Sequence, residues 1–201
     1  MPDAAVTVLL DRARQGDADA FDRIVGQLYG ELRTIARAQR RRLGATDTVN
    51  TTAVVHEAYA KLCGRASGDG ASVAVDFADR THFLRVAARA MRDVIVDHAR
   101  AQSAAKRGGP ARARALDDAG PHAAGVVFDP AEVLSVDAAM AALERLDPEA
   151  ARVVEMRYFA GLSVEETADA LDLSPSTVKR RWTLARAWLY QRLADAPAAG
   201  G

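Results

Sequence analysis

Two short helical patterns separated by a tight turn, near the C-terminal end, place the strongest constraint on the fold. The first pattern covers residues 162–171. The second begins at Ser174-Pro175, where a serine that can cap a helix precedes a proline at the first helical position. From Val178 onward, apolar residues recur at steps of four, three and four: Trp182, Ala185 and Leu189. The pattern predicts a helix–turn–helix whose second helix buries one stripe, with Trp182 in that stripe.

Charge is sorted between these two helices. Residues 174–192 hold five Lys or Arg and no carboxylate, whereas residues 162–173 hold four carboxylates and no cation. Cations neutralise phosphates and supply most of the sequence-independent affinity of a DNA-binding protein. We interpret the second helix as one that enters the major groove of DNA. A basic helix that is simply solvated is the alternative interpretation.

The composition favours helices throughout the chain. Of the 201 residues, 49% are hydrophobic and 27% charged, and the helix formers Ala, Arg, Leu and Glu dominate. The single cysteine, Cys63, cannot form an internal disulfide, and no signal-peptide layout begins the chain. No apolar run approaches the roughly 20 residues of a membrane helix. We therefore expect an all-α cytoplasmic protein with no membrane partner.

The helical patterns form two groups. The first group covers residues 6–14, 17–43, 51–63 and a long helix that opens at Asp79 or Thr81 and runs to about Ala105. Residues 131–146 and 148–159 precede the helix–turn–helix, and Gly and Pro interrupt every periodicity between the two groups. The sequence predicts a helical domain at 1–105, a flexible linker at 106–130, a second helical domain at 131–194 and a disordered tail at 195–201.

Basic and acidic blocks alternate along a chain of zero net charge. Residues 31–43 and 80–107 are basic, and residues 117–155 carry nine carboxylates against two arginines. DNA contacts would therefore be divided between an early and a late surface, with weak binding by the free chain. One hypothesis is that the acidic cluster shields the basic surfaces. Its members are Asp117, Asp118, Asp129 and Glu132.

The order of elements and several motifs resemble the extracytoplasmic-function sigma factors, the small two-domain promoter-recognition subunits of bacterial RNA polymerase. The C-terminal motifs that carry the resemblance include Leu146-Asp147-Pro148, Gly161-Leu162-Ser163, Glu166-Thr167-Ala168 and Ser174-Pro175-Ser176-Thr177-Val178-Lys179. The N-terminal motifs include residues 51–62, residues 82–100 and residues 104–109. Two positions depart from the family pattern. Asp172 stands where the turn commonly holds Gly, and Ala90 follows Arg89 where many relatives carry an Arg-Asn pair.

The resemblance implies two modes of DNA binding. The helix–turn–helix would read the upstream promoter element as duplex, with base-edge contacts from Ser176, Thr177, Lys179 and Arg180 and phosphate contacts from Arg181 and Arg186. The long N-terminal-domain helix would capture single-stranded bases of the downstream element as the strands separate. The candidate residues there are Arg85, Arg89, Arg92, His98, Arg100, Gln102, Lys106 and Arg107. His98 is a candidate for base stacking, with a merely solvated histidine as the alternative.

Residues 51–63 resemble the helix that docks on the clamp helices of the polymerase large subunit. His56, Glu57 and Lys61 can share an exposed face of this helix, while Tyr59 turns inward. Core RNA polymerase and promoter DNA are therefore the expected partners. The sequence leaves open whether an anti-sigma factor also binds and holds the two domains together.

Other functional classes fit the sequence less well. His56, His82, His98 and Cys63 lack metal-site spacing, and no glycine-rich phosphate loop opens a helix, so we expect no metal, no cofactor and no enzymatic activity. A stand-alone transcriptional regulator that binds an operator is the main alternative to a sigma factor. An adaptor that uses the acidic middle of the chain is a third interpretation.

Overall fold

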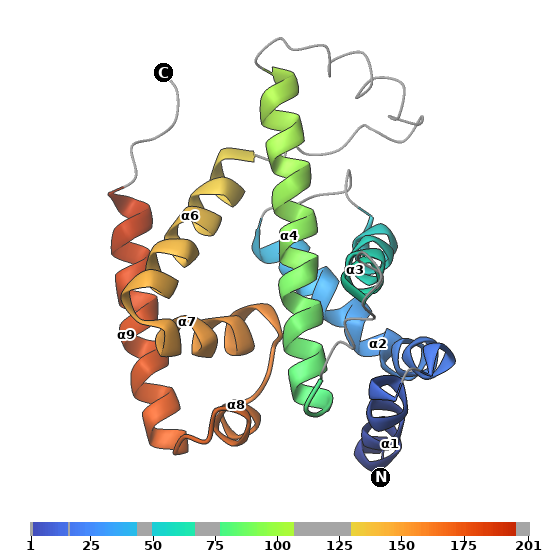
Figure 1. The fold of residues 1–201 in the computed structure, drawn as a ribbon. Coiled ribbons are helices and arrows are strands. Elements are labelled where there is room, and N and C mark those ends of the chain that lie inside the picture. The colour runs from blue at the N-terminus through green and yellow to red at the C-terminus, as the bar shows by residue number, and fades with distance from the viewer. Residues whose placement is uncertain (1, 16, 44–49, 67–76, 107–129, 196–201) are drawn as a thin grey trace.

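In the computed structural model, the described residues are 2–15, 17–43, 50–66, 77–106 and 130–195, and these residues form helices without strands. The N-terminal half, defined here as residues 2–106, contains α1 (Pro2–Arg14), α2 (Ala18–Arg42), α3 (Thr51–Ala66) and α4 (Arg80–Lys106) (Figure 1). The C-terminal half, residues 130–195, contains α6 (Pro130–Leu146), α7 (Pro148–Val154), the π-helix η1 (Glu155–Phe159), α8 (Val164–Leu171) and α9 (Pro175–Ala194). The predicted all-α fold is confirmed.

Side-chain caps begin two helices close to the starts that the sequence predicts for them. Asp17 accepts a hydrogen bond from the backbone N–H of Ala20 at 3.2 Å and caps α2. The pKa of Asp17 is lowered, chiefly by the hydrogen bond from the Arg12 side chain. Asp147 caps α7 by accepting from the N–H of Ala150 at 3.0 Å. These caps satisfy N–H groups that the first helical turn leaves without a partner, so they separate consecutive helices.

One element differs from the prediction. The sequence pattern predicts a continuous helix from 148 to 159, but the last five residues form a π-helix, in which the N–H of Ala160 donates to the Glu155 carbonyl at 2.9 Å. The next hydrogen bond joins the N–H of Leu162 to the Met156 carbonyl, also at 2.9 Å, and Gly161 between them has a φ of 76°. Apolar spacing over five residues does not distinguish a wider helical turn from an ordinary one.

Helix α4 lies at the centre of the molecule, between α3 on one side and α6 on the other (Figure 1). Its buried stripe includes Phe83, Met91 and Ile95, each no more than 1% exposed. Helix α2 packs against α4, and its buried residues recur at three- and four-residue steps, as expected for an amphipathic helix: Ile24, Leu28, Leu32 and Ile35.

The two halves share one hydrophobic core in this structure. Buried residues of α6, such as Val133 and Met140, belong to the same cluster as the α4 stripe. Gln39 of α2 is fully buried at the junction, and its Nε2 donates to the carbonyls of Ala88 at 2.9 Å and Phe159 at 3.1 Å. The predicted linker after Lys106 and the predicted tail after Asp195 lie outside the described residues, so the domain boundaries stay a prediction.

Candidate nucleic-acid interface

The first helix of the helix–turn–helix starts with a reciprocal cap. The Ser163 hydroxyl accepts from the N–H of Glu166 at 3.1 Å, and the Glu166 carboxylate accepts from the N–H of Ser163 at 2.7 Å. Hydrogen bonds from the Ser163 backbone and side chain lower the pKa of Glu166. After α8, Asp172 adopts the left-handed conformation, with φ 53° and ψ 46°. The predicted turn therefore forms with Asp in place of Gly, as short polar residues permit.

The second helix, α9, begins with a cluster of hydroxyl groups. The Ser174 hydroxyl accepts from the N–H of Thr177 at 3.1 Å and caps the helix. It also lies 2.9 Å from the Ser176 hydroxyl and 2.8 Å from the Thr177 hydroxyl. Polar side chains are therefore concentrated where a recognition helix meets base edges.

The predicted stripe and the predicted base-reading residues occupy different faces of α9. Val178 and Ala185 are buried, and Trp182 and Leu189 are half-buried beside them, which places Trp182 in the core contact as expected. Ser176, Lys179 and Arg180 are exposed, and Thr177 is half-buried. Among the described residues, no carboxylate lies within ion-pair distance of Lys179 or Arg180. These cations are available for a nucleic acid.

The two residues predicted to contact phosphates have different surroundings. Arg181 pairs with Asp147 at 3.3 Å and with Glu149, so α9 is joined to the start of α7. Arg186 is exposed and lies over the rings of Trp182 and Tyr190, at 5.5 and 5.7 Å from their centroids. Only Arg186 of this pair is without a carboxylate partner among the described residues.

The cations predicted to capture the downstream element are distributed along α4, and carboxylates of the C-terminal half lie against several of them. Arg89 lies 3.4 Å from Glu144 and 3.6 Å from Glu155. Burial opposes the charged form of Arg89, but the carboxylates of Glu155 and Glu144 outweigh it and raise its pKa. Arg92 is 7% exposed, lies 3.6 Å from Glu155 and packs over the Phe159 ring at 5.1 Å. Part of the contact between the halves is therefore made by side chains that the sequence assigns to DNA.

The remaining α4 candidates are less enclosed. Arg85, His98 and Gln102 are half-buried and Arg100 is exposed. Lys106 is the last residue of α4, and Arg107 lies outside the described residues.

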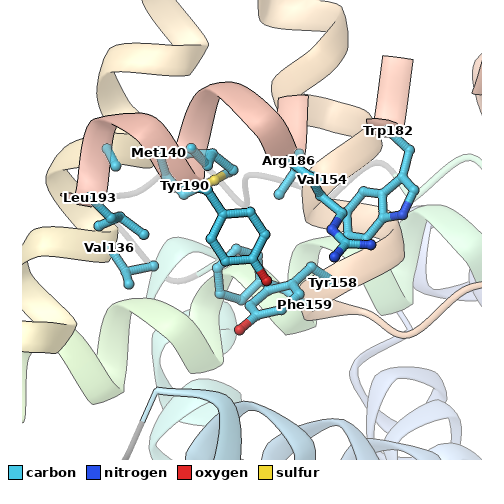
Figure 2. A pocket seen from close by; sticks show the side chains of 11 residues that line it. Val136, Met140, Val154, Tyr158, Phe159, Trp182, Arg186, Tyr190 and Leu193 are labelled. Carbon is cyan, nitrogen blue, oxygen red and sulfur yellow. The ribbon is translucent and has the colours of Figure 1, made fainter. Parts of the chain in front are cut away.

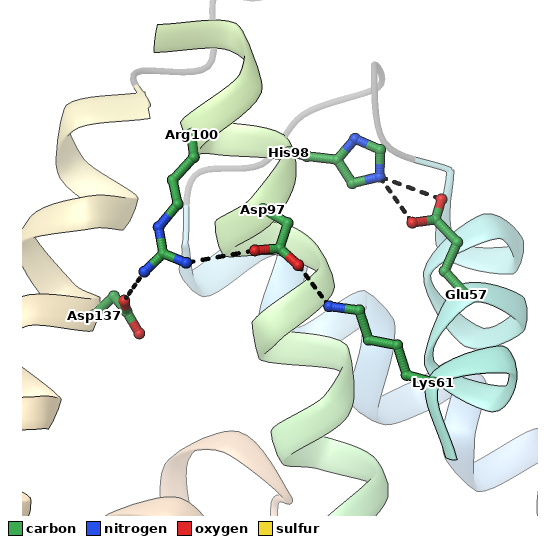
Figure 3. A network of polar contacts seen from close by, with 6 residues as sticks. All are labelled: Glu57, Lys61, Asp97, His98, Arg100 and Asp137. Carbon is green, nitrogen blue, oxygen red and sulfur yellow. Dashed lines mark hydrogen bonds and ion pairs between the residues drawn. The ribbon is translucent and has the colours of Figure 1, made fainter. Parts of the chain in front are cut away.

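A polar network joins the predicted polymerase-binding face to α4 and α6 (Figure 3). Glu57 lies 3.1 Å from His98 Nε2, and Lys61 Nζ lies 2.5 Å from an oxygen of Asp97. Asp97 also meets Arg100 at 3.4 Å, and Arg100 in turn meets Asp137 of α6 at 3.1 Å. His56, the third predicted polymerase contact, is exposed on α3. No local sequence signal points to Asp137, Glu144 or Glu155 as partners of α4, because 37 to 66 residues separate them from the arginines that they meet.

The described residues contain neither a cluster of metal-ligand side chains nor a helix that could span a membrane. No group of three or more His, Cys, Asp or Glu side chains could hold a metal ion there. None of the described helices combines the length and apolar content that a membrane crossing requires.

The fold and the exposed basic start of α9 define an all-helical DNA-binding protein of the helix–turn–helix class. The model of the ECF sigma factor family matches residues 3–195 of the chain. Among solved structures, CnrH in complex with the cytosolic domain of CnrY aligns over 96% of this chain and 99% of that chain, with 24% sequence identity and a TM-score of 0.40. No curated protein gives a significant match.

Because the family match covers nearly the whole chain, the chain belongs to the ECF sigma factor family. It is a sigma factor, which directs core RNA polymerase to specific promoters and assists promoter melting at transcription initiation. Its partners are core RNA polymerase and promoter DNA.

Proposed function

We propose that the two halves of this sigma factor divide promoter recognition between them. The helix–turn–helix within residues 131–194 reads the upstream element as duplex DNA, and residues 1–105 dock on polymerase and capture the downstream element. The observation that carries the proposal is the exposed start of α9, where Ser176, Lys179 and Arg180 lie together and both cations lack carboxylate partners in the described structure. Lys and Arg side chains at this position suit base edges in the major groove.

The downstream element requires the two halves to separate. Arg89 and Arg92 are among the cations proposed to hold single-stranded DNA, and both lie against Glu155 in the described arrangement. A strand of DNA cannot reach a side chain that is 7% exposed, as Arg92 is, without movement of the C-terminal half. Phosphates would then replace Glu144 and Glu155 as the partners of these cations.

The exposed face of α3 is the proposed contact with the polymerase. His56 and Glu57 are exposed, and the Lys61 side chain is 40% exposed, so all three are accessible to a partner protein. Their nearby ion pairs are solvent-exposed, so exchanging them for polymerase contacts costs about 1 kcal/mol or less each.

The proposed activity needs no chemistry in this chain. The protein acts as a non-enzymatic, cofactor-free subunit in the cytoplasm, where its polymerase works. An anti-sigma factor is a further proposed partner, because a protein that stabilises contact between the two halves would keep Arg89 and Arg92 away from DNA.

Run-off transcription tests the proposal directly. Purified core polymerase is incubated with genomic fragments, with and without the full chain, and transcripts are mapped. We expect discrete start sites that depend on the chain and disappear with Lys179→Ala and Arg180→Ala. If the same start sites persist with the double variant, the exposed start of α9 does not read the upstream element, and the proposed division of promoter recognition is wrong.

A further inference from the structure

An apolar cavity lies within the C-terminal half, between α6, η1 and α9 (Figure 2). Its volume is about 200 Å³. Aromatic rings form much of the wall: Tyr158, Phe159, Trp182 and Tyr190. An engineered apolar cavity of about 150 Å³ accepts benzene, so the present cavity has room for one or two fused rings. Its aromatic wall favours a flat aromatic occupant, which can stack or meet ring edges.

Two arginines lie against rings of this aromatic wall. Arg186 lines the cavity and lies over Trp182 and Tyr190, as Figure 2 shows for its position beside Trp182. Arg42, from α2, lies over the Tyr158 ring at 4.7 Å. In the described structure neither arginine lies within ion-pair distance of a carboxylate. An anionic group on the occupant would provide the carboxylate partner that these guanidinium groups lack.

The π-helix η1 supplies two of the aromatic rings in this wall. Tyr158 and Phe159 are consecutive residues of η1, with ring centroids 5.0 Å apart and planes at 86° to each other. Both rings line the cavity, although neighbouring positions of a regular helix point about 100° apart. A single wide helical turn frequently marks a functional position, and here both of its aromatic residues line a cavity.

From the aromatic wall and the unpaired cations we infer that this cavity is a binding site for a small aromatic carboxylate. The ring occupies the apolar space beside Tyr158 and Trp182, and the carboxylate pairs with Arg186. Arg186 is also proposed to contact a DNA phosphate, so the occupant and the upstream promoter element compete for it. This competition rests on the proposed function, whereas the binding site itself does not.

A binding experiment with 2-naphthoate tests the site on the full chain. The indole N–H resonances of the two tryptophans give separate probes, because Trp182 lines the cavity and Trp188 does not. We expect saturable binding of one ligand per chain by calorimetry, with a resonance shift at Trp182 that exceeds the shift at Trp188. Trp188→Phe assigns the two signals. Failure to saturate, or equal shifts at both tryptophans, would overturn the site.

Charge-matched variants test the carboxylate contact. Arg186→Gln should weaken 2-naphthoate binding about tenfold, as expected for loss of a charge-assisted hydrogen bond. Arg192→Gln, on the same helix but outside the cavity wall, should leave it unchanged. The neutral 2-naphthamide should bind the native chain about tenfold more weakly than 2-naphthoate and should not respond to Arg186→Gln. Equal effects of both arginine variants, or equal affinity for both ligands, would contradict the assignment.

A third measurement tests the proposed competition with DNA separately from ligand binding. Saturating 2-naphthoate should reduce affinity of the native chain for duplex promoter DNA, and 2-naphthamide should reduce it less. If 2-naphthoate binds as expected but DNA affinity does not change, the competition for Arg186 is wrong and the site stands. If core polymerase loaded with the chain recognises no promoter even without 2-naphthoate, the proposed division of promoter recognition fails independently of the ligand result.

Discussion

Adjacent arginines on α9 illustrate how one helix serves two purposes. Arg180 is exposed and has no carboxylate partner in the described structure, whereas Arg181 is held by Asp147 and Glu149. The 100° rotation between consecutive helical positions places the Arg180 guanidinium on the exposed surface, where DNA is proposed to bind, and the Arg181 guanidinium toward α7. Sequence reasoning assigns both to DNA. For Arg181 a phosphate contact stays a prediction, and the structure gives the residue a second role in joining α9 to α7.

Lys179→Ala combined with Arg180→Ala should reduce duplex affinity for the upstream element. Truncating each side chain should cost about 1–3 kcal/mol of binding free energy, because the base edge that it contacts is left buried without a hydrogen-bond donor. Fluorescence anisotropy on the promoter duplex measures this effect. Arg192→Ala is the matched control, since it removes a cation from the far end of α9. Similar losses in DNA and polymerase binding by the double variant would indicate that the pair supports the fold instead.

Glu57→Lys should weaken binding to core polymerase and leave the fold intact. The Glu57 side chain is 49% exposed and its contact with His98 is solvated, so the contact contributes about 0.2–1 kcal/mol to stability. Pull-down with core polymerase and thermal unfolding distinguish the two effects. Asp169→Lys makes the same charge change at an exposed position of α8 and should preserve polymerase binding. A large drop in melting temperature would contradict a docking role for Glu57.

At the scale of elements, local chemistry accounts for the helix–turn–helix. Ser163 and Glu166 begin α8, Ser174 begins α9, and Asp172 supplies the reversal between them. The backbone N–H of Asp172 donates toward the carbonyls of Ala168 and Asp169, which the end of a helix leaves without partners. Each of these caps and the turn depends on contacts between residues no more than four positions apart, so the sequence can predict them. The wide turn of η1, by contrast, has no such local signature.

Asp172→Gly should stabilise the helix–turn–helix by about 0.5–1 kcal/mol. A non-glycine residue at positive φ carries a steric cost that glycine lacks, and this gain exceeds the entropy that glycine adds to the unfolded chain. Chemical denaturation of the full chain measures the change. Asp169→Gly, inside α8, should instead destabilise by about 1 kcal/mol. Destabilisation by both substitutions would show that the Asp172 side chain makes a necessary contact.

The cap of α8 should contribute to stability in a pH-dependent way. The pKa of Glu166 is lowered on folding, so its charged form is favoured in the native state. The stability that this charge adds to the fold is complete above about pH 4.5, the ordinary pKa of the group, and is lost as pH falls through the lower pKa of the folded state. Glu166→Gln should therefore cost about 0.5–1 kcal/mol at neutral pH, a modest amount for a largely solvated group, and progressively less below pH 4.5. A pH-independent difference between the two proteins would contradict this linkage.

At the scale of the whole molecule, carboxylates of the C-terminal half lie where promoter DNA is proposed to bind. The sequence suggests shielding by an acidic cluster, but three of its members, Asp117, Asp118 and Asp129, lie outside the described residues. In the described structure Glu144 forms an ion pair with Arg89, and Glu155 forms one with Arg92. The contact is imperfect, because Nε and Nη1 of Arg92 make no hydrogen bond in the described structure. A buried charge without its full set of hydrogen bonds weakens the contact between the halves and would favour the proposed separation on DNA.

Glu144→Gln combined with Glu155→Gln should increase affinity for single-stranded DNA. The substitutions free Arg89 and Arg92 from their carboxylates, so both can bind phosphates. Titration at several salt concentrations should give a slope of log affinity against log salt that is steeper by about 0.7 for each additional phosphate that the chain neutralises. Glu165→Gln, at an exposed position of α8, is the control and should leave the affinity unchanged. Unchanged affinity and slope would show that these arginines do not bind the strand.

The sequence alone determined the all-helical fold, the serine cap of α9, the buried stripes and the exposed basic start of α9. These features depend on interactions within one or two helical turns, and periodicity, capping residues and local charge report such interactions directly. Lys179 and Arg180, for example, are exposed because they lie on a different face of the helix from Val178 and Ala185. The domain boundaries at the linker also follow from composition alone, and they stay a prediction.

Only the tertiary structure decided which helices meet and which charges pair. Arg89 and Glu144 are 55 residues apart, and Gln39 and Phe159 are 120 residues apart, yet both pairs are joined. Such contacts depend on how α2, α4 and the C-terminal half pack, and no local pattern encodes the relative position of separate helices. For the same reason, the cavity beside Tyr158 and Trp182 exists only once α6, η1 and α9 are assembled.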